Sequence, residues 1–385
     1  MINKVYIIWW WVTRFIIDPQ KMKKVEEDFL SWKIKHNTYD LMLSKGFIDL
    51  YWKENVLNCQ VRWKWEYKNI LWHKWFVWNY FWLFKELWIN RKHSLFFFNW
   101  MYPWVLIYSL IPWAYKACRR HALIWPYKKC ENKIKRVLLF LIQIFFQFFI
   151  DTIFYVNEPE KKELKKYHFL WNKYFLPIPI NISFRSHDTI KKLEKNKLII
   201  SSTGSICKRK NQKLILEAIA KIRNIKPELE IHLNLIGWSM LYHGLGADTY
   251  GNKIRNFLKY HNINHVYFKG HISAEELKKV YWETDVFIQA SFTEGLCQTY
   301  IEAWLCWCPL ILSDIPTFRD TAKDFALFFD PRDSEELAKR ILEMIDNIEY
   351  YKIKSIEFKK YLKNRGYNSF THQLESFNAK FLTND

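Results

Sequence analysis

Short apolar runs alternate with amphipathic helical patterns through the second half of the chain. We expect strands over residues 198–202, 230–236, 265–268, 285–290, 309–313 and 326–329, with helices between them. Two capping boxes support the helix starts, Ser273 with Glu276 and Asp333 with Glu336. Strands that alternate with helices of this length are typical of a parallel, doubly wound α/β sheet.

The first half of the chain carries a weaker version of the same pattern. Its strand candidates are VYII at 5–8, SLFFF at 94–98, HALI at 121–124 and TIFYV at 152–156. Between the halves, Pro177 and Pro179 suit an extended linker, because proline disfavours helix in the residue before it. We therefore predict two Rossmann-like α/β domains, residues 1–180 and 181–365, that face each other across a cleft at the carboxyl ends of their strands.

Composition and charge narrow the class of protein. The 385 residues include 59 Lys and Arg against 39 Asp and Glu, a net charge of +20, and 50% are hydrophobic, which excludes a disordered polyelectrolyte. The seven cysteines form no CxxC pair, so they indicate neither a disulfide framework nor a zinc module, and they fit a reducing cytoplasm. The N-terminus has the pattern of a first strand rather than of a signal peptide. The sequence lacks zinc-finger, RNP and helix-turn-helix signatures, so we expect no nucleic-acid partner.

The longest apolar run, residues 137–150, leaves two interpretations open. It is too short to span a bilayer, and it contains Gln143 and Gln147. It forms either a packed core helix or a helix that lies on a membrane surface. The lysines at 161, 162, 165 and 166 suit an anionic lipid surface or a solvated helix face. One expectation is therefore a cytoplasmic protein that is peripheral at the inner face of the plasma membrane.

Glycine and tryptophan have unusual abundances in this chain. It has 9 Gly and 21 Trp, and residues 47–203 contain 13 Trp without a single Gly. We hypothesise that many of these tryptophans are UGA codons that the source cell reads as glycine. The alternative is true tryptophan enrichment, which a membrane-interface protein would explain. The tryptophans in question, several of which stand where a backbone turns tightly or needs glycine, are Trp9, Trp10, Trp11, Trp88, Trp304 and Trp307.

A pair of glutamates follows the strand expected at 285–290. Glu294 precedes Gly295 in a loop, and Glu302 lies eight residues later, about two turns into the next helix, on a nearby azimuth. The amides of residues 295–298 form a helix N-terminus that can hold a phosphate. Open α/β sheets bind their ligands at this end of the strands.

The stretch EGLCQTYIEAWLCWCPLI resembles the GT-B glycosyltransferases of the large family-four group. The hallmark of that family is a glutamate, seven residues and a second glutamate, which Glu294 and Glu302 match. In place of the usual Gly-Phe-Gly the chain has Gly295, Leu296 and Cys297. The pair of glutamates thus stands in a context similar to that of a nucleotide-sugar donor site.

The resemblance extends over residues 198–381. The segment STGSICKRKNQ is similar to the phosphate segment of the family, with Lys210 at the position of the phosphate lysine, whereas Ser205 replaces the preceding arginine. HVYFKGHIS, which contains Gly270, resembles the strand and turn that hold the base. Residues 366–385 look like the helix that crosses back to the first domain in this family.

This resemblance implies a retaining glycosyltransferase that moves a sugar from a UDP- or GDP-sugar to a glycan or lipid-linked acceptor in cell-surface polysaccharide biosynthesis. It implies no bound metal, which the lack of a DxD motif fits, and no cofactor, since the nucleotide sugar is a substrate. Lys210 and loop amides would stabilise the negative charge of the diphosphate. Glu294 would hold the sugar hydroxyls, and Glu302 would hold the ribose. The catalytic candidates are Glu294, Lys210 and, in the first domain, His121. The donor-binding candidates are Gly204, Ser205, Lys210, Gly270, Glu294, Gly295, Leu296, Cys297 and Glu302.

Other interpretations of the same residues stay open at this point. Glu302 could instead pair with a neighbouring lysine, and Lys210 could belong to a solvated KRK run. His73 and His93 compete with His121 for the catalytic role in the first domain. The rival functions are a GT-B-shaped protein that binds sugars or partners without turnover, and a nucleotide-sugar epimerase.

Overall fold

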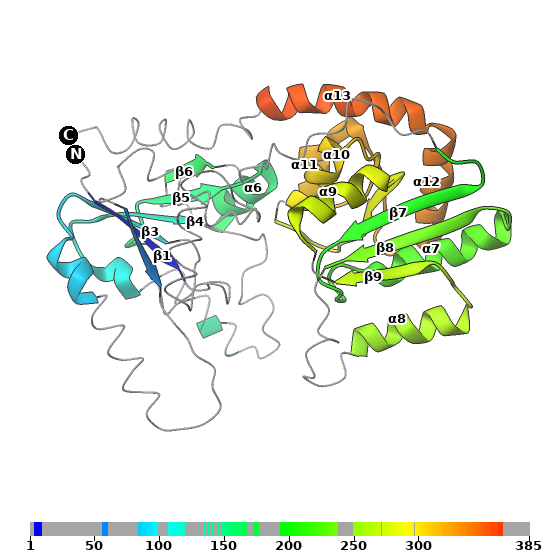
Figure 1. Cartoon of the computed structure of the whole chain (residues 1–385). Coiled ribbons are helices and arrows are strands. Elements are labelled where there is room, and N and C mark those ends of the chain that lie inside the picture. The colour runs from blue at the N-terminus through cyan, green and yellow to red at the C-terminus, as the bar shows by residue number, and fades with distance from the viewer. Residues whose placement is uncertain are drawn as a thin grey trace. The chain divides into compact units, whose positions relative to one another are not determined.

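The chain divides into two compact units, residues 1–179 with 369–385 and residues 180–368, here called the first and second domains. Each contains a parallel β-sheet with helices (Figure 1), which confirms the predicted α/β fold class with two parallel-sheet domains. The computed structural model describes residues 4–9, 56–60, 84–98, 107–119, 134, 137, 138, 141, 145, 148–167, 172–176, 193–237, 249–270, 272–295 and 297–364.

The second domain is built on a parallel sheet. Among its described residues the strands lie in the order β12-β11-β10-β7-β8-β9. These are β7 Lys197–Thr203, β8 Glu230–Ile236, β9 Val266–Gly270, β10 Val286–Gln289, β11 Leu310–Ser313 and β12 Ala326–Phe329. Each strand lies on one of the predicted apolar runs. Strands β10, β11 and β12 are buried at every residue, as expected for parallel strands that helices cover on both faces.

The connecting helices begin where the sequence supplies a cap. Ser273 forms the predicted capping box, because its Oγ accepts from Glu276 N (3.2 Å) and its own N donates to Glu276 Oε2 (2.8 Å). Asp333 also caps a helix, but the Glu336 carboxylate accepts from Asp330 N (2.7 Å), so the second predicted box is only half formed. The helices are α7 Gln212–Ile225, α8 Thr249–Tyr260, α9 Ala274–Glu283, α10 Gln298–Leu305, α11 Pro316–Ala322, η6 Lys323–Phe325, α12 Ser334–Asp346 and α13 Ile348–Asn364.

Both faces of the second sheet carry helices, as the side chains of β10 show. Val286 and Ile288 belong to a buried core that also includes apolar residues of α7 and α12. Phe287, which lies between them, instead packs edge to face against Tyr281 of α9, with ring centroids 5.8 Å apart. Because successive side chains of a strand point to opposite faces, α7 and α12 lie on one face and α9 on the other.

The first domain has a second parallel sheet. Its described strands lie in the order β2-β1-β3-β4-β5-β6. They are β1 Lys4–Trp9, β2 Val56–Gln60, β3 Ser94–Phe98, β4 Tyr115–Arg119, β5 Thr152–Tyr155 and β6 Asn172–Phe175, with η3 Ile107–Leu110 and α6 Glu158–Tyr167 among the helical segments. The apolar runs at 5–8, 94–98 and 152–156 are strands, as predicted. Strands β2, β4 and β6 were not predicted, because their mixed polar and apolar residues lack a clear pattern.

Three sequence predictions on the domain architecture fall on residues outside those that the structure describes. They are the strand at 121–124, the linker with Pro177 and Pro179, and the crossing helix at 366–385.

The apolar run of the first domain presents exposed side chains. Ile134, Val137, Leu138, Leu141 and Phe145 are helical and 51–81% exposed. Their spacing of three and four residues places them along one face of a helix. These side chains therefore lie outside any core, while half of the run from 137 to 150, on which the interpretation as a packed core helix depends, falls outside the described residues. Within the described part of the chain, no helix is long and apolar enough to cross a membrane.

Trp307 occupies the glycine position of a Schellman motif at the end of α10. Its backbone is left-handed (φ 67°), its N–H donates to Trp304 O (2.9 Å), and Cys308 N donates to Ala303 O (3.1 Å). Its indole Nε1 is buried and finds no acceptor among the described residues. A bulky residue with positive φ is a steric outlier, so this turn has the backbone geometry that glycine adopts without strain.

The other tryptophans in question divide by backbone conformation. Trp88 lies inside the helical segment 84–89 and does not have positive φ, so its backbone does not call for glycine. The left-handed residue after this helix is His93 (φ 58°). Trp304 is helical and fully buried, stacked on Phe358 with ring centroids 3.5 Å apart. Trp113, which the sequence analysis did not single out, is left-handed (φ 62°) and 67% exposed. Trp10 and Trp11 lie outside the described residues.

Candidate active site

The carboxyl ends of β7, β8 and β9 are tied together through glycine backbones. Gly204 (φ 126°) follows β7 and Gly237 (φ 138°) follows β8, conformations that L side chains rarely adopt. A Cβ on Gly237 would lie 2.4 Å from the Gly204 carbonyl oxygen. Gly204 N donates to Ile236 O and Gly237 N donates to Gly270 O, each over 2.8 Å. Only glycine permits this approach of two loops at one corner of the sheet.

A lysine side chain runs across this glycine corner to a buried carboxylate. A Cβ on Gly204 would lie 2.8 Å from Lys210 Cε, so glycine leaves the room that the lysine fills. Lys210 Nζ lies 2.7 Å from Glu294 Oε1, and Arg209 Nη1 lies 2.8 Å from the same oxygen. Arg209 also donates to Thr293 O (3.0 Å). One carboxylate thus joins the loop after β10 to the loop after β7.

The three residues of the KRK run have different surroundings. Lys208 is exposed and the Arg209 side chain is 42% exposed, whereas the Lys210 side chain is only 10% exposed. Burial by itself would lower the pKa of Lys210, but Cys297 and the Glu294 carboxylate together outweigh it and raise that pKa above its usual value. Lys210 is therefore a buried, charged partner of Glu294 rather than part of a solvated run.

Cys297 lies beside this ion pair at the start of α10. Its backbone is left-handed (φ 61°), and its Sγ lies 3.4 Å from Thr299 Oγ1 and 3.9 Å from Lys210 Nζ. Burial raises the pKa of the Cys297 thiol, so the sulfur is protonated at neutral pH. Glu294 is consequently the group that balances the charge of Lys210. The N-terminus of α10 starts at the next residue and adds the positive end of a helix dipole to this corner.

Glu302 lies inside α10 and is buried, with 7% of its surface exposed. Burial raises the pKa of Tyr281 well above its usual value, and the charge of Glu302 raises it further. Glu302 therefore lies within electrostatic reach of this phenol. The described contacts join Glu294, Lys210 and Cys297 directly, while Glu302 lies deeper along the helix.

The remaining candidate residues are spread around this corner or lie outside the described part of the chain. Ser205 is exposed, and its carbonyl accepts from Gln212 Nε2 (3.0 Å). Gly270 ends β9 with φ 63°, and Gly295 is half-buried in the loop after β10. Leu296, His73 and His121 are not among the described residues, whereas His93 lies in the turn before β3.

Sequence reasoning missed two members of the corner. Arg209 shares the Glu294 carboxylate with Lys210, and its place in the KRK run was the available signal. Gly237 makes the closest backbone approach, and the signal was a glycine directly after the strand EIHLNLI.

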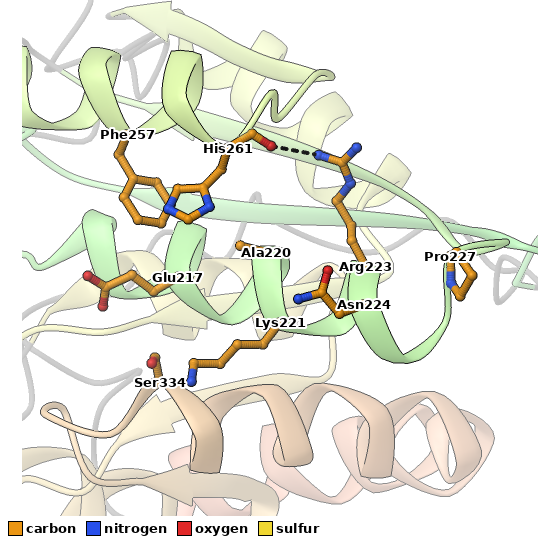
Figure 2. Close-up of a pocket in the computed structure, with 9 residues that line it drawn as sticks. All are labelled: Glu217, Ala220, Lys221, Arg223, Asn224, Pro227, Phe257, His261 and Ser334. Atoms are coloured by element: carbon orange, nitrogen blue, oxygen red, sulfur yellow. Dashed lines mark hydrogen bonds between the residues drawn. The ribbon is translucent and has the colours of Figure 1, made fainter.

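A hollow elsewhere in the second domain contains none of the predicted site residues. It lies among α7, α8 and α12, and Figure 2 shows the side chains of Lys221, Arg223 and His261 around it. Arg223 Nη1 donates to Asn262 O (2.7 Å), and Lys221 pairs with Glu335 (2.8 Å). The basic groups of this hollow are thus engaged with the protein itself.

Two parallel-sheet α/β domains, the second with a glycine-lined corner that holds a buried lysine, have the architecture of GT-B glycosyltransferases. Residues 184–367, just under half of the chain, match the family described as "Glycosyl transferases group 1", so the second domain is similar to members of this family.

Three known proteins illustrate the likeness. Protein CapJ of Staphylococcus aureus is 29% identical over 237 residues, which are 57% of this chain and 55% of that protein. O-antigen chain mannosyltransferase B of Escherichia coli is 26% identical over 80 residues, 21% of each chain. The chain thus spans about half or less of the curated relatives that it matches. Anabaena HepE in complex with UDP shares the fold, with a TM-score of 0.70 and 12% identity over 98% of this chain and 100% of that chain.

The glycine corner predicts a graded series of stability losses. We expect Gly237→Ala to lower the free energy of unfolding most, by about 3 kcal/mol, because its Cβ would meet backbone that cannot move aside. Gly204→Ala should lower it less, because the flexible end of Lys210 can yield. Gly270→Ala serves as the control, with no atom within 4 Å of the new Cβ and a loss of about 1–2 kcal/mol from positive φ alone. Urea denaturation measures the series, and equal losses at all three positions would contradict the close approach.

Proposed function

We propose that this protein transfers a sugar from a UDP- or GDP-sugar to a glycan or lipid-linked acceptor, with retention of anomeric configuration, in cell-surface polysaccharide biosynthesis. The observation that carries the proposal is the buried Lys210–Glu294 pair at the glycine corner, inside the region that matches the family. The UDP bound to Anabaena HepE and the mannosyltransferase name of the Escherichia coli relative support a nucleotide-sugar donor and a polysaccharide product.

In this proposal the corner receives the diphosphate of the donor. When the bond between the sugar C1 and the diphosphate oxygen breaks, negative charge develops on the leaving nucleoside diphosphate. Lys210, the backbone amides near Gly204 and Gly295, and the start of α10 would stabilise that charge without a metal ion. Glu294 would accept hydrogen bonds from the donor sugar hydroxyls, and Glu302 would hold the ribose. The nucleotide sugar is consumed as a substrate, so the proposal includes no cofactor.

The remaining candidates have subsidiary roles in this proposal. Ser205, Leu296 and Cys297 would line the donor pocket, and Gly270 would lie near the base. Residues 1–180 would bind the acceptor, His121 would contribute from that domain, and residues 366–385 would cross back to it.

Substitution of the ion pair tests the proposed roles. We expect Lys210→Met to lower kcat/KM for nucleotide-sugar turnover about 10²- to 10³-fold, because charge on the leaving diphosphate loses its cation. Glu294→Gln should lower kcat about 100-fold while leaving affinity for the nucleoside diphosphate nearly unchanged. Lys208→Met is the matched control, since this exposed neighbour should leave both constants within about twofold. Full activity of Lys210→Met would disprove the role of the corner.

The same assay separates the rival functions. Chromatography of the products identifies a glycoside, an isomerised nucleotide sugar or unchanged donor, which indicate a transferase, an epimerase and a non-catalytic binding protein, respectively. Proton NMR of the glycoside gives its anomeric configuration, and an inverted product would contradict the retaining mechanism.

We further propose that the protein is cytoplasmic and associates with an anionic membrane at its inner face. The apolar helix face, from Ile134 to Phe145, exposes large side chains to water, and a lipid surface would remove them from it. The net charge of +20 adds attraction to anionic lipid. This association would also bring a lipid-linked acceptor to the enzyme.

Vesicle binding tests the membrane proposal. Leu141→Glu with Phe145→Glu should reduce co-sedimentation with anionic phosphatidylglycerol vesicles at least about tenfold, because two charges would enter the apolar contact. Ile225→Glu, at an apolar position of the second domain that is 62% exposed, is the control and should bind like the unsubstituted protein. If both proteins bind equally, the apolar face is not the docking surface.

We also propose that UGA is read as glycine in the source cell and that Trp307 and Trp113 are two positions where glycine belongs. The left-handed backbone at both residues and the Schellman hydrogen bonds around Trp307 support this proposal. Exposed Trp113 has little packing to lose, whereas fully buried Trp304 packs as a true aromatic residue does.

Peptide mass spectrometry of the protein from its native cells tests the recoding, with glycine expected at 113 and 307. In the tryptophan-containing protein, Trp113→Gly should raise the free energy of unfolding by about 1 kcal/mol, because it relieves a left-handed bulky residue. Trp304→Gly should lower it by about 3–5 kcal/mol through the cavity it leaves. Tryptophan at 113 and 307 in the native peptides would end the proposal.

A further inference from the structure

Two histidines and a glutamate converge at the amino ends of β8 and β9. His232 Nε2 lies 2.7 Å from Glu230 Oε1, and His265 Nε2 lies 3.4 Å from the same oxygen. One ligand atom from each of the three side chains lies within 4.8 Å of the others. The imidazole rings stack with centroids 4.6 Å apart. Both Nε2 atoms lie near Glu230 Oε1.

The backbone sets this convergence. Glu230 and His232 are two residues apart on β8, so their side chains lie on the same face of the sheet. His265 directly precedes β9, and its carbonyl accepts from Leu233 N (2.9 Å), which fixes it beside β8. Its left-handed backbone (φ 60°) turns the chain at this point.

A fourth residue supports the orientation of His232. Tyr267 Oη lies 3.4 Å from His232 Nδ1, on the side of the ring away from Glu230. When the His232 Nδ1–H donates a hydrogen bond to Tyr267 Oη, Nε2 is unprotonated. Its lone pair is then available to bind a metal ion. Metal-binding histidines have this arrangement, in which a second hydrogen bond holds the ring and selects the tautomer.

We propose that Glu230, His232 and His265 bind a divalent transition metal ion, with Zn²⁺ as the ion best suited to two imidazoles and one carboxylate. Tetrahedral zinc with bonds of about 2.0–2.1 Å brings neighbouring ligand atoms to about 3.3 Å from each other. His265 Nε2 already lies at such a distance from Glu230 Oε1 (3.4 Å), whereas His232 Nε2, at 2.7 Å, would move away from that oxygen to admit the ion. The side chains of His265 and Glu230 are about half exposed, so an ion and a water ligand can reach the site.

This site is separate from the proposed donor site. It lies at the amino ends of β8 and β9, whereas Gly237 and Gly270 lie at the opposite ends of these strands. The bound ion would join the edge strand β9 to β8, and it would have no contact with the diphosphate. Nucleotide-sugar turnover is therefore not expected to need it.

Isothermal titration of Zn²⁺ into the full chain, freed of any affinity tag, tests the proposal. We expect one tight site per chain, with affinity reduced at least about tenfold in His232→Gln and in His265→Gln. Tyr267→Phe should weaken binding about tenfold or more while all three ligands remain. His261→Gln, which changes a histidine that packs on Phe257 outside the cluster, should bind like the unsubstituted protein.

Two further measurements make the outcome decisive. The visible absorption of added Co²⁺ reports tetrahedral coordination, and it should be present in the unsubstituted protein and lost in the two histidine variants. Circular dichroism shows whether each variant is folded. A further variant, Glu230→Gln, removes the charge of one ligand while it keeps a hydrogen-bond acceptor for His232. Absence of Zn²⁺ binding by the unsubstituted protein, or equal binding by the folded variants, would overturn the proposal.

Discussion

The loops at the carboxyl end of the second sheet depend on one buried ion pair, which lies beside a backbone approach that only glycine can accommodate. Lys210 reaches Glu294 by passing over Gly204, and the Gly204 carbonyl in turn lies against Gly237. A buried cation without a partner would be costly, so the loop that carries Glu294 must stay closed on the loop that carries Lys210. The pair therefore orders both loops before any ligand arrives, and such preorganisation is what electrostatic catalysis requires.

At the carboxyl end of this sheet, positive φ falls mainly on glycine, whereas at the amino end it falls on Asn196 and His265. Gly204, Gly237 and Gly270 follow or end β7, β8 and β9, and Cys297 follows β10 as the non-glycine member of the set. Residues held in sparsely populated conformations persist where the surrounding structure determines them, and they gather at ligand sites. The arrangement of the candidate site therefore depends on backbone conformation as much as on side-chain charge.

The sequence was sufficient to predict the parallel sheets and part of the corner, for identifiable reasons. Buried parallel strands such as LILS are recognisable as apolar runs. Ser273 predicts the start of a helix, because its capping hydrogen bonds are made with Glu276, which is close in sequence. Arg209 and Gly237 do have local signals, but these signals do not tell which distant loop each residue pairs with, which is why both were missed. Trp88 was grouped with tryptophans at glycine-requiring turns, but it lies inside a helix that continues to residue 89.

At the end of α10, the hydrogen-bond pattern shows which backbone conformation residue 307 must adopt, which the sequence alone does not show. The Schellman bonds to Ala303 and Trp304 require a left-handed residue at 307 whatever its side chain. The Nε1 atoms of both indoles are buried and have no partner among the described residues. The two residues differ because Trp307 has a strained, left-handed backbone, whereas Trp304, three residues earlier, is helical and stacks on Phe358. Two tryptophans in one turn thus differ in whether the fold makes use of their side chain. The backbone requirement at 307 belongs to the turn between α10 and β11, so it holds regardless of how the codon is read.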